Sequence, residues 1–164
     1  MTQRYLIALG SNMRVPGIGA PRQVLTAALA ALEAQGLQID AASAIMTSAP
    51  LGPSRRHYAN AAVIISCLHQ PPELLARLQT IEQAFGRRRR GRRWGARPLD
   101  LDIVLWSGGS WAQQWLTIPH PAFRARTFVL RPAAAIAGRW RDPMTHRTLR
   151  QLAARLIVRR PLPR

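Results

Sequence analysis

The sequence predicts an α+β fold in which an antiparallel sheet carries two helices on one face. Segments of strand and helix type follow one another in the order β-α-β-β-α-β, which is the ferredoxin-like order. Both helical segments begin at proline and are followed by glycine, and short additional elements come at the C-terminus. The length of 164 residues suits one hydrophobic core, so we expect a single domain over residues 1–164.

The first half of the chain contains a strand, a helix and a second strand. "RYLIAL" at 4–9 is an apolar run of strand length, and apolar residues recur at helical spacing over 21–35. We expect the second strand over 37–48. The "GSN" at 10–12 is typical of a tight turn, and we interpret it as a turn rather than as a ligand site.

The second half repeats the same order of elements. A β-rich run over 58–69 is followed by a helix over 70–86 and by a strand over 99–106. Beyond that strand we expect a loop, a helix that starts near Pro121, and a short terminal helix over 148–156.

The charge of the chain is unbalanced, with 24 basic residues against 7 acidic ones and a net charge of +17. Every basic residue is arginine, which excludes both the lysine-dependent phosphate-binding loop and a Schiff-base lysine. Such a charge favours polyanionic ligands: nucleic acid, membrane headgroups or nucleotide phosphates.

The sequence does not indicate a membrane or secreted protein. No apolar run approaches the roughly 20 residues that span a bilayer, and the N-terminal segment lacks the features of a signal peptide. The single cysteine, Cys67, excludes an intrachain disulfide and suits a reducing compartment. We therefore expect a cytoplasmic protein without a membrane partner.

Two carboxylates interrupt the apolar strand over 99–106. Alternation along a strand predicts one face with Asp100, Asp102, Val104 and Trp106 and another with Leu99, Leu101, Ile103 and Leu105. The Cα atoms of the two aspartates would lie roughly 6.5 Å apart, so the carboxylates can share Mg²⁺ ions with substrate phosphates. The alternative is a solvated pair of carboxylates that bind nearby arginines.

An arginine-rich loop precedes these aspartates. Residues 87–97 contain seven arginines and one tryptophan, with glycines that allow the segment to bend. Guanidinium groups bind phosphate oxygens, so this loop beside two carboxylates suits a nucleoside triphosphate and its metal ions. The alternative is a ferredoxin-like RNA-binding module that uses the arginine-rich loop.

Five motifs resemble those of one enzyme family in order and spacing. They are "ALGSN", "APLGP…YANAAV", "IEQAFGR", "RWGARPLDLDIVLW" and "IPHPAFRARTFVL", and the family is that of the 6-hydroxymethyl-7,8-dihydropterin pyrophosphokinases. The resemblance spans about residues 5 to 138. It implies transfer of pyrophosphate from ATP to the hydroxymethyl oxygen of the reduced pterin, with AMP released, in folate biosynthesis. It also implies a monomeric, Mg²⁺-dependent cytoplasmic enzyme with no specific nucleic-acid partner.

The resemblance also implies the site residues. Asp100 and Asp102 would bind two Mg²⁺ ions, and Arg87 and Arg97 would join them as catalytic residues. The implied ATP-binding residues are Gln79, Glu82, Arg89, Trp94, Ile103, Thr117, His120 and Arg126. The implied pterin-binding residues are Ser48, Ala49, Leu51, Tyr58, Asn60, Trp94 and Phe128.

Several of these residues have a simpler interpretation when the resemblance is set aside. Phe128 in "TFVL" suits an ordinary core position, and His120 between two prolines suits a turn. Glu82 suits a surface acid of a helix that pairs with a nearby arginine. The segment "SRRH" after Pro53 is short and basic where family members often carry a longer acidic or amide-rich segment.

Overall fold

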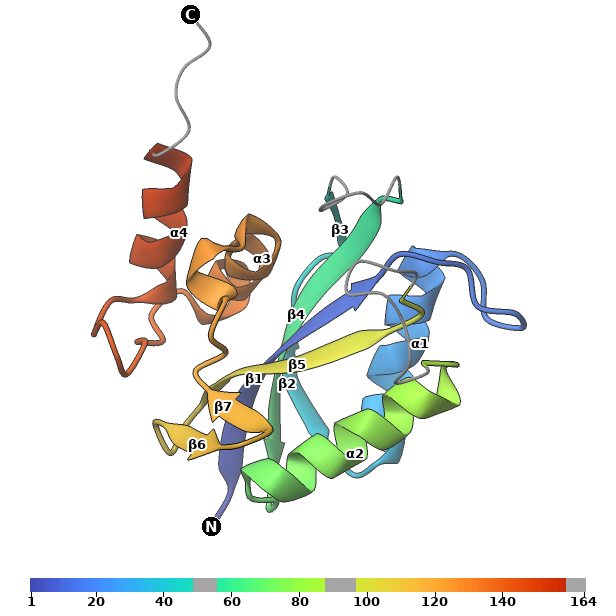
Figure 1. The fold of residues 1–164 in the computed structure, drawn as a ribbon, viewed down its shortest axis with the longest axis horizontal. Coiled ribbons are helices and arrows are strands. Elements are labelled where there is room, and N and C mark those ends of the chain that lie inside the picture. Colours follow the sequence, from blue (N-terminus) through green and yellow to red (C-terminus); the bar gives the residue numbers. More distant parts are fainter. Residues whose placement is uncertain (49–55, 88–96, 159–164) are drawn as a thin grey trace, which may run out of the picture.

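The computed structural model describes residues 1–48, 56–87 and 97–158, and these form one antiparallel sheet with helices on both of its faces (Figure 1). The strand order is β2-β4-β1-β5, and β3 also pairs with β4. The strands are β1 (Gln3–Ser11), β2 (Gln38–Ala42), β3 (Met46–Ser48), β4 (Tyr58–Cys67) and β5 (Asp100–Trp106).

The centre of the sheet is formed by β1 and β4. Their antiparallel register runs from Gln3 opposite Cys67 to Ser11 opposite Ala59. Both strands read as continuous apolar runs, because helices bury the side chains on each face. The ends of β1, β4 and β5 that come together in this register form the floor of the site described below.

One face of the sheet is covered by α1 (Pro21–Ala34) and α2 (Pro71–Ala84). Proline occupies the first turn of each helix, and the side chains of Gln23 and Glu73 accept the backbone N–H groups at the N-caps. The apolar stripe of each helix lies in the larger of the two cores. The predicted helices over 21–35 and 70–86 therefore agree with the structure.

The opposite face is covered by α3 (Thr127–Ala137), which follows the short 3₁₀ helix η1 (Phe123–Ala125), and α4 (Leu149–Val158) packs on α3 and η1. A second core lies between them and the sheet, with Leu6 and Ile64 on the sheet side and Phe123 and Leu130 on the helix side. The expected additions thus form a complete layer. RNA-recognition modules of this topology stack bases on an open sheet face, and here that face is occupied.

Three predicted elements differ from the structure. The strand expected over 37–48 is divided into β2 and β3, because Ser43 breaks the regular pairing and binds Ala62 through both its N–H and its hydroxyl oxygen. The helix expected near Pro121 begins at Thr127, after η1. A hairpin of β6 (Trp111–Gln113) and β7 (Leu116–Ile118) replaces part of the expected loop. The sequence did not predict this hairpin, because strands of three residues are too short to show a clear alternation of apolar and polar side chains.

A β-bulge at Val104 changes the faces of β5. Leu6 of β1 pairs with Leu105 and Ile7 pairs with Ile103, so Val104 is left between two ladder positions. The predicted assignment of side chains to the two faces of this strand is correct from Leu99 to Val104 and wrong for Leu105 and Trp106. Leu105 lies in the second core, and Trp106 turns to the first, where it stacks on Tyr5 with ring centroids 6.4 Å apart.

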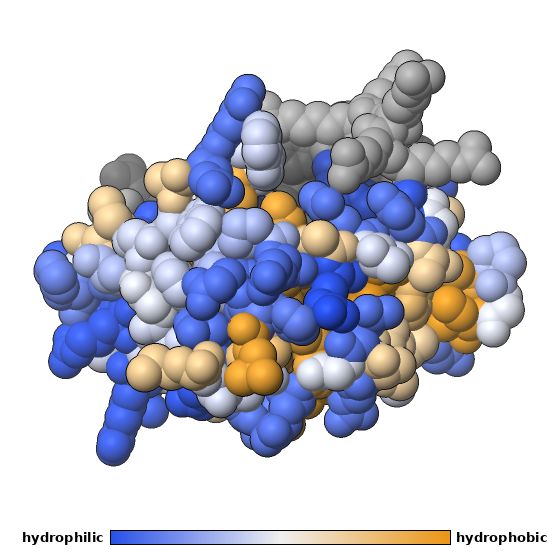
Figure 2. Space-filling model, turned by 90° about the horizontal axis from the view of Figure 1, so that it is seen from below, coloured by the Kyte–Doolittle hydropathy of each residue, from blue (hydrophilic) through white to orange (hydrophobic). Residues whose placement is uncertain are grey.

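The surface is largely hydrophilic where Figure 2 shows it, as the charge of the chain predicts. Among the helices that the structure describes, none is both long enough and apolar enough to cross a bilayer.

Candidate active site

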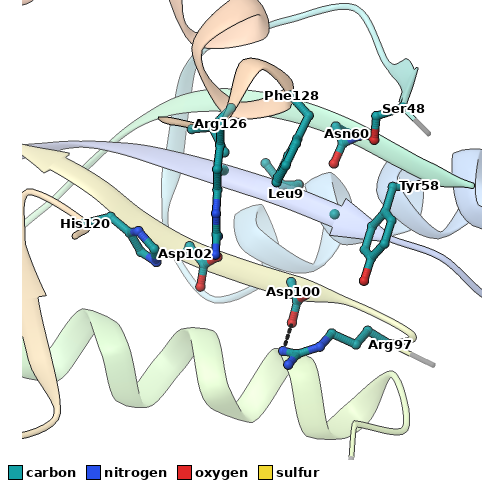
Figure 3. A pocket seen from close by; sticks show the side chains of 13 residues that line it. Leu9, Ser48, Tyr58, Asn60, Arg97, Asp100, Asp102, His120, Arg126 and Phe128 are labelled. Carbon is teal, nitrogen blue, oxygen red and sulfur yellow. Dashed lines mark hydrogen bonds and ion pairs between the residues drawn. The ribbon is translucent and has the colours of Figure 1, made fainter. Parts of the chain in front are cut away.

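A pocket of about 230 Å³ lies where the ends of the central strands meet the layer of α3 (Figure 3). Its lining residues are Ala8, Leu9, Gly10, Ser48, Tyr58, Asn60, Arg97, Asp100, Asp102, His120, Arg126, Phe128 and Val129. Nine of the fourteen expected site residues that the structure describes therefore meet in one cavity, although they come from segments far apart in the sequence. The sheet contributes the acids and amide, while the C-terminal layer contributes His120, Arg126 and Phe128.

The two aspartates of β5 point into this pocket from the same face of the sheet (Figure 3). Their partners across the ladder on β1 are small: Gly10 stands opposite Asp100, and Ala8 stands opposite Asp102. Small neighbours leave space above the carboxylates. Figure 3 also shows the side chain of Arg126 extending toward Asp102.

Asp100 is the centre of an ion-pair network. Its Oδ1 atom lies 2.8 Å from Arg87 Nη1 and 3.2 Å from Arg97 Nη1. Burial raises the pKa of the Asp100 carboxyl and nearby Asp102 adds to the rise, although Arg87 and Arg97 act in the opposite direction. A nearby cation stabilises the charged form of such a poorly hydrated carboxylate.

The acidic groups suit a metal ion that takes only part of its coordination from protein. Among the described residues, no cluster of three or more His, Cys, Asp or Glu side chains forms a complete metal site. Asp100 and Asp102 can supply two carboxylates, which leaves the remaining positions to water or substrate oxygens. Mg²⁺ is commonly bound in this way, by one or two carboxylates together with phosphates.

Glu82 of α2 supports the network from behind the pocket. Its Oε1 atom accepts the N–H of Leu101 over 2.8 Å and a second hydrogen bond from Arg87 Nη1. Its side chain is only 9% exposed, and this burial raises its pKa to about 7. The interpretation of Glu82 as a surface acid is wrong as to its position, because the residue is buried, and correct as to its arginine partner.

His120 is held by the bulge in β5. The backbone N–H of His120 donates to the carbonyl of Val104 over 3.0 Å, and its Nδ1 atom accepts the N–H of Ala122 over 3.2 Å. A neutral imidazole with this bond carries its proton on Nε2. Burial lowers the pKa of His120, which favours that neutral form. The ring can therefore donate to a ligand oxygen as a neutral group.

The other part of the pocket combines a buried amide with two aromatic rings. Asn60 is 3% exposed, and its Nδ2 donates to Ser48 Oγ over 2.6 Å. This bond orients the amide of Asn60, whose Oδ1 lies on the side of Gly10. The rings of Tyr58 and Phe128 border the pocket from β4 and α3 (Figure 3). Phe128 therefore contacts both the second core and the pocket.

The end of β1 contributes residues that the sequence analysis interpreted as a turn. Gly10 and Ser11 belong to the strand, and Gly10 lines the pocket. Asn12 is 3% exposed; its Oδ1 accepts the N–H of Arg97 over 2.6 Å and its own N–H donates to the Arg97 carbonyl over 3.1 Å. The interpretation of "GSN" as a tight turn is wrong, because these residues continue the strand and then bind Arg97. A buried strand that ends in polar residues was the available signal.

Some expected site residues do not line the pocket. The Ile103 side chain is buried in the first core, on the opposite face of β5, and Thr117 is exposed on β7. Gln79 is half-buried on α2, while Glu82 and Arg87 lie behind Asp100. Ala49, Leu51, Arg89 and Trp94 lie outside the described residues. Conversely, Ala8, Leu9 and Val129 line the pocket but read in the sequence as ordinary core positions.

Comparison with known protein families identifies the family of this chain. The model of the family described as 7,8-dihydro-6-hydroxymethylpterin-pyrophosphokinase (HPPK) matches residues 6–138. The chain belongs to this family.

Two relatives show how far the similarity extends along the chain. The 2-amino-4-hydroxy-6-hydroxymethyldihydropteridine pyrophosphokinase of Synechocystis sp. is 39% identical over 148 residues, covering 90% of this chain and 73% of the relative. The pyrophosphokinase of the same name from Pseudomonas aeruginosa is 39% identical over 145 residues, with 87% and 86% covered.

Solved structures of the HPPK family share the fold. The crystal structure of Plasmodium falciparum HPPK-DHPS with pteroate matches with a TM-score of 0.75 and 12% sequence identity. The match covers 97% of this chain and 45% of that chain, so this chain spans less than half the length of the solved one. At such low identity the likeness concerns the fold alone.

Proposed function

We propose that this HPPK-family protein transfers the pyrophosphoryl group of ATP to 6-hydroxymethyl-7,8-dihydropterin. The products are AMP and the pterin diphosphate, and the reaction is a step of folate biosynthesis. Family membership and the names of the relatives support this function. The observation that carries it is the single pocket in which Asp100 and Asp102 lie beside cationic groups, with the amide of Asn60 at the other end.

Asp100 and Asp102 are proposed to hold two Mg²⁺ ions together with the phosphates of ATP. When bound, such ions neutralise phosphate charge and align the transferred group with the attacking hydroxyl. The protein contributes the two carboxylates and the shape of the site. No general base is proposed among the described side chains of the pocket, because Asp100 and Asp102 both serve as metal ligands.

The arginines around Asp100 are proposed to change partners when substrates bind. In the structure Arg87 and Arg97 pair with the Asp100 carboxylate. Phosphate oxygens offer the guanidinium groups an alternative acceptor, and bound cations offer the carboxylate an alternative partner. The exchange keeps every charge compensated, so Arg87 and Arg97 can stabilise charge on the transferring group and on AMP. His120 and Arg126 are proposed to bind phosphate oxygens from the C-terminal layer.

The pterin is proposed to lie between the rings of Tyr58 and Phe128, with its edge on Asn60. A flat heterocycle stacks well on aromatic rings, and a carboxamide can both donate to it and accept from it. Ser48 fixes the direction of that amide. Ala49, Leu51 and Trp94 remain proposed pterin contacts. Arg89, Trp94, Gln79, Glu82, Thr117 and Ile103 remain proposed nucleotide contacts, and Ile103 has the least geometric support because its side chain faces the first core.

We also propose that residues 1–164 act as one monomeric domain in the cytoplasm. The strand order β2-β4-β1-β5 and the helices α1 and α2 on one face support a ferredoxin-like core. The single cysteine supports a reducing compartment. The RNA-binding alternative has no support, because α3 packs on the sheet face that such a module would need.

One assay tests the proposed function. Purified protein is incubated with ATP, Mg²⁺ and 6-hydroxymethyl-7,8-dihydropterin, and nucleotides are separated by chromatography. AMP should form in equimolar amount with the pterin diphosphate, and only when both pterin and Mg²⁺ are present. ADP as the first product would identify an ordinary kinase, and ATP consumption without pterin would identify a hydrolase. Asp40→Asn serves as the control variant, because this carboxylate on β2 pairs with Arg4 and does not line the pocket.

A further inference from the structure

A buried ion pair lies outside the pocket, between η1 and the segment that precedes α4. Arg124 Nε lies 2.6 Å from Asp142 Oδ2, and Arg124 Nη2 lies 2.8 Å from Asp142 Oδ1. The side chain of Asp142 is 0% exposed and that of Arg124 is 30% exposed. Two parallel hydrogen bonds between a guanidinium and a carboxylate fix the relative orientation of the two groups as well as their distance.

Asp142 is itself firmly held by its own segment. Its carboxylate also accepts the N–H of Met144 over 3.1 Å and the hydroxyl of Thr145 over 2.7 Å. Its backbone N–H donates to the carbonyl of Arg147, and its carbonyl accepts the N–H of His146. Asp142 is therefore a rigid anchor in the C-terminal layer. It lies beyond residues 6–138, which match the family model.

Arg124 lies at the centre of the segment that carries two pocket residues. The N–H of Phe123 donates to the His120 carbonyl over 3.3 Å, and the N–H of Arg126 donates to the Phe123 carbonyl over 3.2 Å. Phe123 is 1% exposed in the second core, and the Arg124 guanidinium lies 4.7 Å from the centroid of its ring. One side chain thus holds a tight turn whose two ends are His120 and Arg126.

We propose that Arg124 and Asp142 are positioning residues of the nucleotide site, which fix η1 so that His120 and Arg126 both face the pocket. This inference rests on the proposed function only in taking those two residues as phosphate contacts. Neither Arg124 nor Asp142 lines the pocket itself. Their effect passes through the short turn between them and the ligand-binding groups.

An ion pair at this place does more than hold η1 against the segment that precedes α4. Apolar contact of Phe123 already binds η1 to the second core, but apolar contacts alone leave a short turn some freedom to rotate. A bidentate pair removes that rotation. Displacing a contact group by about 1 Å costs up to about a hundredfold in rate, so orientation matters at this site.

The test compares the Arg124→Gln variant with a variant of similar stability loss elsewhere. Leu32→Ala is suitable, because Leu32 is fully buried on α1, on the opposite face of the sheet. Binding of a non-hydrolysable ATP analogue with Mg²⁺ is measured by calorimetry well below both melting temperatures. Steady-state KM for ATP and for the pterin are measured in parallel. Arg124→Lys keeps the cation and serves as the conservative variant.

We expect Arg124→Gln to weaken analogue binding and raise the KM for ATP by about tenfold, with a much smaller change for the pterin. Arg124→Lys should recover part of this loss, and Leu32→Ala should stay within about twofold of the wild type. Equal losses in Arg124→Gln and Leu32→Ala, or no loss in Arg124→Gln, would overturn the positioning role. If the wild type binds the analogue but forms no AMP, the proposed transfer fails and the binding comparison still decides this inference.

Discussion

Asn12 and Arg97, which lie 85 positions apart in the chain, are joined by two hydrogen bonds at the edge of the pocket. Both backbone polar groups of Arg97 are satisfied by this one residue, and the Arg97 guanidinium then lies 3.2 Å from Asp100. The end of β1 therefore determines where this arginine stands relative to the acids of β5.

Asn12→Ala should lower the stability by about 1–3 kcal/mol, because it removes a buried acceptor for the Arg97 N–H. It should also reduce kcat, since Arg97 loses its fixed place beside Asp100. Urea denaturation and initial rates measure the two effects. Ser11→Ala is the matched control: Ser11 is equally buried and adjacent, but its hydroxyl binds the carbonyl of Met13. Identical kinetics in the two variants would contradict the link between Asn12 and Arg97.

Asp102→Asn should reduce turnover by about a hundredfold or more while the protein remains folded. The side chain is half-buried and lines the pocket, and its proposed role is to bind cations and phosphates rather than to pack. Circular dichroism checks the fold, and calorimetry with Mg²⁺ and an ATP analogue checks the binding. Near-normal activity at saturating Mg²⁺ would exclude Asp102 as a metal ligand.

Glu82 should make stability depend on pH between about 4.5 and 7. Burial raises its pKa from the ordinary 4.5 to about 7, so the folded state holds this proton more tightly than the unfolded state. The contribution of the protonated Glu82 to the free energy of unfolding is complete below pH 4.5 and is lost as the pH rises from 4.5 to about 7. Glu82→Gln keeps an acceptor for Leu101 but does not titrate. The free energy of unfolding of Glu82→Gln should therefore rise relative to that of the wild type by about 1–3 kcal/mol between pH 4.5 and 8. A constant difference between the two proteins, followed by urea denaturation across this range, would refute the assignment.

Asp142 should show the opposite dependence in acid. Although burial alone would raise its pKa, hydrogen bonds from Arg124, Thr145 and Met144 lower it from 3.8 to about 2. The stabilisation is therefore complete above pH 3.8 and is lost as pH falls toward 2. Asp142→Asn should cost about 2–3 kcal/mol at pH 7, and the difference from the wild type should shrink below about pH 4. Thermal melts of both proteins from pH 2 to 7 test this, and a difference that stays constant over the whole range would contradict it.

Gly10→Ala should weaken pterin binding without unfolding the protein. A Cβ at this position would lie 3.6 Å from Asn60 Oδ1 and 3.8 Å from Tyr58 Cδ1, which are ordinary contact distances. The methyl group would nevertheless occupy the pterin end of the pocket. Affinity for a pterin analogue should fall by about tenfold, while affinity for an ATP analogue in the same variant serves as the internal control. An equal loss for both ligands would show that the substitution disturbs the whole site.

The sequence predicted α1, α2 and the acidic face of β5 because those features depend on local signals. Proline and glycine mark the helix ends, and alternation places Asp100 and Asp102 together. Alternation then fails at Val104, because a bulge depends on pairing with β1 and has no signature in β5 itself. The same holds for Asn12, whose partner is defined only when the ends of two strands meet.

Apart from the two aspartates of β5 and the arginine loop before them, the composition of the pocket was predicted only through the family resemblance. Tyr58, His120 and Phe128 each suit an ordinary structural position when taken alone, and their meeting depends on how the third layer docks. The pair of Arg124 and Asp142 was not predicted at all. An arginine and an aspartate 18 positions apart carry no local signal that one of them is fully buried.

The pocket lies between the sheet and the C-terminal layer, and this arrangement has a consequence for how the protein responds to its ligands. A nucleotide held by Asp102 on one side and by Arg126 on the other acts as a tie between the sheet and the C-terminal layer. Binding then adds its free energy to the docking of that layer and leaves the larger core below the sheet unchanged. Hydrogen exchange of α3 and α4 should therefore slow more on ligand binding than exchange of α1 does. The local stability of the C-terminal layer, measured by hydrogen exchange, should therefore show whether a ligand is bound at the site.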